Sequence, residues 1–162
     1  MEDTVFTIDI NSIQKKAKSN LSAMGKRLVG KDGKTLFAST TLSSAEESLL
    51  NSYIQKGIEI FLGEISPIII GYTDGDTVVL SIRTNRLNEG KVQAFRENFS
   101  SFVVEYAIQK VLGLSLTEEA RRNAEEDLQR HLSSSIKLVF QKDAPTVTHQ
   151  SLSGMTGEVI ID

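Results

Sequence analysis

The sequence predicts an α+β fold that is mostly α, with about four helices, a central β-hairpin, a short N-terminal strand and an extended C-terminal arm. Three observations lead to this prediction. Apolar residues recur at helical spacing in four long stretches, alternating residues open the chain, and an Asp-Gly turn separates two short apolar runs near its middle. With 162 residues, 40% of them hydrophobic, the chain is long enough to bury one core. We place a single domain at residues 1–145 and the arm at 146–162.

The chain is expected to begin with a strand and an amphipathic helix. Residues 4–10 alternate between apolar and polar side chains, which indicates a strand. From Asn11 the period becomes helical, with Asn11 or Ser12 as the cap, and the helix is expected to run for about four turns. The Gly- and Lys-rich turn at residues 30–34 ends it.

A second helix is expected to follow. Ser44 and Glu47 have the spacing of a capping box, which predicts its start. Pro67 disfavours helical geometry in the residue before it, so the helix is expected to end near Ser66. The runs around Asp74-Gly75 then predict a hairpin from Ile68 to Ile82.

Two more helices are expected in the second half. One begins between Asn88 and Lys91 and runs to about Leu112, with an aromatic-rich stripe along it and Gly113 after it. The other starts at a capping box spanning residues 115–118 and ends either at Ser133 or at Gln141. The sequence after Pro145 shows no period, which is typical of a tail.

The charge is distributed unevenly along the chain. The formal net charge is −3, but residues 1–10 carry −3, residues 11–37 carry +6 and the remainder carries −6. Because the chain as a whole is mildly acidic, its net charge does not favour general nucleic-acid binding. The N-terminus lacks the pattern of a secretory signal and no apolar run approaches a membrane span, so we expect synthesis in a cytoplasm and no membrane partner.

The composition excludes several classes of chemistry. The chain has no Cys and two His, which excludes disulfide scaffolds, thiolate metal sites and thiol catalysis. Neither His131 nor His149 has a second ligand at metal spacing, and no serine lies in a nucleophile-elbow pattern. Gly33-Lys34-Thr35 lacks the first glycine of a phosphate-binding loop. We therefore expect no enzyme activity, no cofactor and no metal.

Two groups of carboxylates are candidates for catalytic or metal-binding roles. Asp74 and Asp76 flank a tight turn but lack the five or six patterned oxygen ligands of a Ca²⁺ loop. The acidic residues between Glu118 and Asp127 alternate with arginines, which indicates an exposed salt-bridged helix surface rather than an acid–base pair.

The candidate functional residues are therefore interaction residues. The first group is a set of cations on the first helix, and the second is an apolar tip near the end of the chain: Lys15, Lys16, Lys18, Lys26 and Arg27, then Val159, Ile160 and Ile161. The cations suit an acidic protein surface or nucleic acid, and a plain solvated face stays open as well. No aromatic residues alternate with the lysines, which disfavours base stacking.

The order of elements resembles a family of small structural proteins of phages and prophages of gut Bacteroidales, including crAss-like phages. The landmarks span roughly residues 4–145: Phe6 to Ile10, Ser44 to Glu47, Asp74 to Asp76, Phe95 to Tyr106, Thr117 to Ala120, and Lys142 to Pro145. The resemblance implies a non-enzymatic virion protein in a head–tail connector (neck) ring, on or below the portal protein. No catalytic residue is carried over.

The resemblance also implies the partners. Copies of the chain would form a cyclic ring, twelvefold to match the portal, next to the portal and adjacent neck or tail proteins, with DNA only passing through the channel. The expected location is the neck or tail region of the virion, after synthesis in the host cytoplasm. The alternative is a cytoplasmic nucleic-acid- or protein-binding module that uses the Lys-rich first helix.

Overall fold

Four α-helices contain most of the residues that the structure describes, so the expectation of a mostly α fold is confirmed. A computed structural model describes residues 4–27, 42–73, 77–82, 89–113 and 116–140. The elements along the chain are β1 (Thr4–Asp9), α1 (Ile10–Arg27), α2 (Ser44–Glu64), the 3₁₀ turn η1 (Ser66–Ile68), β2 (Ile69–Thr73), β3 (Thr77–Ile82), α3 (Glu89–Leu112) and α4 (Glu118–Phe140).

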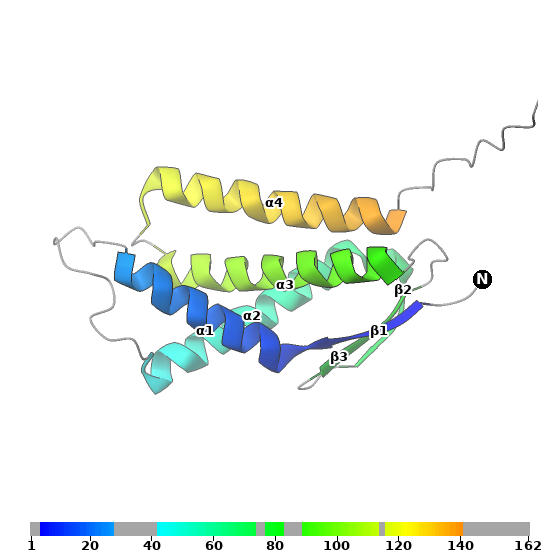
Figure 1. The fold of residues 1–162 in the computed structure, drawn as a ribbon, viewed down its shortest axis with the longest axis horizontal. Coiled ribbons are helices and arrows are strands. Elements are labelled where there is room, and N and C mark those ends of the chain that lie inside the picture. Colours follow the sequence, from blue (N-terminus) through cyan, green and yellow to red (C-terminus); the bar gives the residue numbers. More distant parts are fainter. Residues whose placement is uncertain (1–3, 28–41, 74–76, 83–88, 114–115, 141–162) are drawn as a thin grey trace, which may run out of the picture.

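Helix α3 is the centre of the molecule. It packs against α1 and α2 on one side and against α4 on the other (Figure 1). Apolar side chains are consequently buried on several faces of α3, among them Phe95, Val104 and Ile108. The aromatic stripe that the sequence indicates on this helix is core: the Phe61 ring of α2 meets the Phe95, Phe99 and Phe102 rings edge-on at 5.7, 4.8 and 5.4 Å between centroids.

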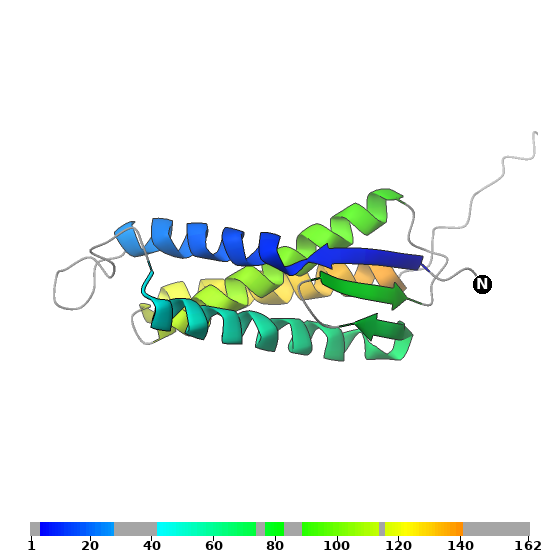
Figure 2. The ribbon, with the colours of Figure 1, turned by 90° about the horizontal axis from the view of Figure 1, so that it is seen from below.

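The strands form one antiparallel sheet at one end of the helical body (Figure 2). The strand order is β1-β3-β2, so the N-terminal strand pairs with β3 from Thr4 opposite Ile82 to Asp9 opposite Thr77. Strands β2 and β3 occupy the stretch where a hairpin was expected, as two members of a three-stranded sheet with an irregularity between Ile69 and Gly71. The Asp74-Gly75 turn lies outside the described residues and stays a prediction.

Two of the predicted helix caps are wrong by two or three residues. Helix α1 begins at Ile10, and its cap is Asp9, whose Oδ1 accepts from the Asn11 N–H at 3.0 Å. Ile10 itself is buried in the core. Because its side chain must reach the core, the helix starts directly after the strand. At α4 the cap is Thr117, whose Oγ1 accepts from the Ala120 N–H at 3.2 Å.

The capping box of α2 is shifted by one residue from the prediction. The Glu46 N–H donates to Ser43 Oγ at 3.3 Å, and the Ser43 N–H donates to Glu46 Oε2 at 2.7 Å. Because two serines and two glutamates follow one another, a capping box could form either from Ser43 and Glu46 or from Ser44 and Glu47. The fold uses the box of Ser43 and Glu46, and Glu47 instead contacts α1, with its Oε1 3.0 Å from Lys18 Nζ.

Helix α4 continues past Ser133 to Phe140. The serines do not end it, and the buried Ser135 hydroxyl is satisfied within the helix because it donates to the His131 carbonyl at 2.9 Å. Gly113, after α3, has φ +44, as expected for a glycine that ends a helix. The boundary between a domain at 1–145 and an arm lies beyond the last described residue.

Candidate functional site

The predicted cations all belong to α1, but they differ in exposure. Lys15 and Lys16 are exposed, and no ion pair holds them within the described part of the chain. Lys18 is half-buried and is paired with Glu47 of α2. The side chains of Lys26 and Arg27 lie outside the described residues. The described free positive surface is therefore smaller than the sequence suggests.

The contact of Lys18 with Glu47 is structural. Both side chains are about two-fifths exposed, at 39% and 42%, so solvent screens the pair and its contribution to stability is below about 1 kcal/mol. Its effect is on position, since it joins α1 to the first turn of α2. The other predicted interaction residues, Val159, Ile160 and Ile161, lie outside the described residues.

The first turns of α4 form a surface of mixed charge with a small excess of carboxylates. Glu118, Glu119 and Glu125, with Arg121 and Arg122, line an open depression of about 680 Å³. Exposed ion pairs continue along the helix, with Arg122 3.8 Å from Glu126 and Arg130 in contact with Asp127. This is the exposed, salt-bridged arrangement expected from the sequence.

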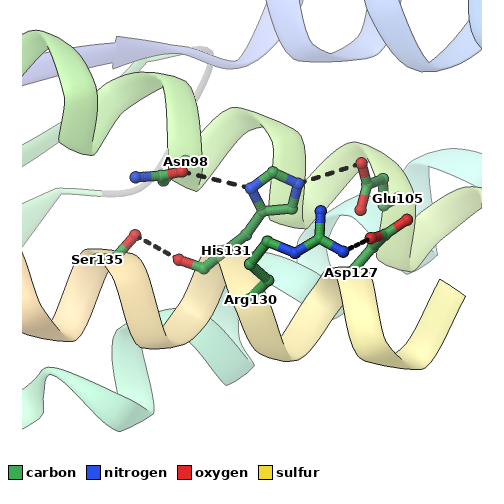
Figure 3. A network of polar contacts seen from close by, with 6 residues as sticks. All are labelled: Asn98, Glu105, Asp127, Arg130, His131 and Ser135. Atoms are coloured by element: carbon green, nitrogen blue, oxygen red, sulfur yellow. Dashed lines mark hydrogen bonds and ion pairs between the residues drawn. The ribbon is translucent and has the colours of Figure 1, made fainter. Parts of the chain in front are cut away.

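A polar cluster joins α3 to α4, as Figure 3 shows. His131 Nδ1 lies 3.3 Å from Asn98 Oδ1, and Nε2 lies 3.3 Å from Glu105 Oε1. A carboxylate only accepts, so Nε2 carries the proton toward Glu105, while the Asn98 amide can satisfy Nδ1 in either orientation. His131 thus has both ring nitrogens occupied within the fold, which is the arrangement of a structural histidine.

The sequence pattern did not single out Asn98 and Glu105. They are seven residues apart on α3, which places both on one face two turns from each other. That spacing was the available signal. The spacing alone does not predict the polar cluster, because the position of His131 between the two residues depends on how α4 packs on α3.

A second feature that the sequence did not predict is an apolar groove between α1, α3 and α4. It has a volume of about 310 Å³ and is lined by Asn20, Met24, Glu105, Ile108, Gln109, Leu112, Leu116, Ala120, Ala124 and Asp127. Its lining is mainly apolar, with two carboxylates among it. The groove exists because α1 and α4 both pack on α3 without closing on each other.

The described residues contain no cluster of three or more His, Asp or Glu side chains that could hold a metal ion. The other candidates lie outside the described residues, so their interpretations stay predictions; they are residues 33–35, Asp74, Asp76 and His149. No helix within the described ranges is long and apolar enough to span a membrane.

The fold and these surfaces define an α-rich α+β domain. Its described features are charged helix surfaces, a structural polar cluster between α3 and α4, and an apolar groove. Comparison with protein-family models, with curated proteins and with solved structures gave no match.

Proposed function

We propose that this chain is a non-enzymatic structural protein of a phage virion, a subunit of a head–tail connector ring that docks on or below the portal protein and joins capsid to tail. The proposal rests on the family resemblance of the element order together with one feature of the structure. Unlike surfaces lie at different places: a basic patch of Lys15 and Lys16 in the first half of α1, a mixed-charge surface with a small excess of carboxylates at the start of α4, and an exposed aromatic at the end of α4.

Unlike surfaces on one chain favour a cyclic assembly. In a ring, each copy presents one surface to a different surface of the next, whereas a twofold dimer needs a surface that complements itself. Complementary charge guides such contacts and excludes the wrong partners. Lys15 and Lys16 would face an acidic surface, on a neighbouring copy or on the portal.

The copy number of the purified chain tests the proposal. Native mass spectrometry at micromolar concentration, alone and with the portal protein of the same phage, is expected to give a closed ring, of twelve copies if it matches the portal. A monomer under both conditions would overturn the ring.

A charge-reversed variant tests whether the basic patch, Lys15 and Lys16, contributes to binding of the ring to the portal protein. Lys15→Glu with Lys16→Glu is expected to lower the share of portal-bound rings. Lys56→Glu with Lys110→Glu makes the same charge change on α2 and α3 and serves as the control. Duplex DNA binding that weakens steeply with salt in a chain that does not assemble would instead support the nucleic-acid-binding alternative.

A further inference from the structure

Helix α4 carries two unlike features at opposite ends. Its first half forms one wall of the apolar groove, at the end of the molecule away from the sheet (Figure 1). Its last turn lies at the end that carries the sheet, and there Phe140 is exposed. One copy cannot bring these two places together, because a rigid helix separates them.

The groove is an apolar hollow with acidic side chains in its lining. Ile108, Leu112 and Leu116 are buried in its floor, and Met24 of α1 is 37% exposed at its side. Glu105 contributes a carboxylate, and its Oε2 is buried with no hydrogen-bond partner in the described structure. An occupant that combines an apolar group with a nearby cation would match this lining.

The end of α4 has that combination. Phe140 is 40% exposed, and Lys137, one turn before it, is exposed on the same face of the helix. A dry apolar cavity of about 150 Å³ accommodates a benzene ring, so a groove of about 310 Å³ has room for a phenyl side chain. The cation can then approach Glu105 and Asp127.

We propose that the groove binds the end of α4 of a second copy, with Phe140 inserted and Lys137 beside the carboxylates. This inference rests on the proposed ring, and it names the contact between neighbouring copies. Because groove and inserted residue lie at opposite ends of α4, the contact is head-to-tail and can repeat from copy to copy, and it closes a ring where the rotation between neighbouring copies divides the full circle.

Two variants, each lacking one side of the contact, test the proposal when they are mixed. Phe140→Asp removes the inserted ring and keeps the groove, whereas Ala124→Phe fills the groove and keeps Phe140. Each variant alone is expected to be monomeric in native mass spectrometry. The equimolar mixture is expected to form dimers and to stop there, because only one intact contact can form.

The matched controls change residues outside the contact. Leu49→Asp alters an apolar side chain of similar exposure on α2, and Ala45→Phe enlarges an exposed alanine. Both are expected to assemble like the unmodified chain. Circular dichroism checks that each variant folds, and Ala120→Phe replaces Ala124→Phe if the latter does not.

The outcomes separate this inference from the function on which it rests. If the unmodified chain forms rings but the mixture of folded variants stays monomeric, or if either variant assembles normally, the groove contact is wrong and the ring remains. If the unmodified chain is monomeric with and without the portal, the ring and the contact fail together.

Discussion

At the scale of single residues, the start of α2 shows how one local choice is made. The sequence contains two overlapping capping boxes, and the fold uses the one formed by Ser43 and Glu46. Their mutual hydrogen bonds satisfy two backbone N–H groups at the helix start. The bonds from the Ser43 backbone and side chain also lower the pKa of Glu46 from its usual 4.5.

Replacing the cap is expected to destabilise the fold. Ser43→Ala should lower the free energy of unfolding by about 1 kcal/mol, because the Glu46 N–H loses its acceptor. Ser44→Ala, one position later, is the control and should change it by less than about 0.5 kcal/mol. Urea denaturation at pH 7 measures both, and a larger loss for Ser44→Ala would place the cap at the other serine.

The pH dependence of stability should carry the signature of Glu46. Because its folded pKa is depressed, its contribution is complete above pH 4.5 and is lost as the pH falls through the lower folded pKa. Glu46→Gln should therefore be less stable than the unmodified chain at pH 7, and the difference should shrink below pH 4.5. Thermal unfolding of the two proteins at a series of pH values checks this, and a constant difference would contradict it.

At the scale of elements, α2 and α3 approach each other closely at Gly57. A Cβ added there would lie 3.1 Å from the Tyr106 ring and 3.5 Å from the Val103 Cα. The position therefore excludes a large side chain, and the rings of Phe61 and the α3 aromatics pack next to it. By contrast, a Cβ added at Gly63 on the same helix meets nothing within 4 Å.

These two glycines predict opposite effects. Gly57→Leu is expected to lower the free energy of unfolding by about 2 kcal/mol or more, because the added atoms force the helices apart. Gly63→Ala should raise it by about 0.5 kcal/mol, because alanine favours the helix and the space is open. Denaturant midpoints of both variants provide the measurement. A stable Gly57→Leu protein would show that α2 and α3 do not pack this closely.

At the scale of the whole molecule, the core of the described residues draws on the first strand and on all four helices, with Ile8, Phe61 and Val139 among its buried side chains. The residues after Pro145 were expected to act in assembly rather than in folding.

Deleting Thr146 to Asp162 is therefore expected to leave the free energy of unfolding within about 0.5 kcal/mol and to reduce the share of assembled protein. Chemical denaturation and native mass spectrometry of the truncated chain measure the two effects. An unfolded product, or one that assembles normally, would contradict this role of the arm.

The sequence by itself determined what depends on neighbours along the chain. Apolar spacing located four helices to within a few residues, Pro67 and Gly113 marked helix ends, and alternation marked the first strand. Local patterns identify such elements because backbone geometry and side-chain periodicity act over a few residues.

The tertiary structure decided what depends on contacts between distant residues. Glu46 bonds to the cap while Glu47 pairs with Lys18 of another helix, and the first strand pairs with β3. The tertiary structure also placed His131 between Asn98 and Glu105 and left the groove open between α1 and α4. Periodicity shows which face of a helix is buried, but the neighbour that covers it is set by the packing of the whole chain.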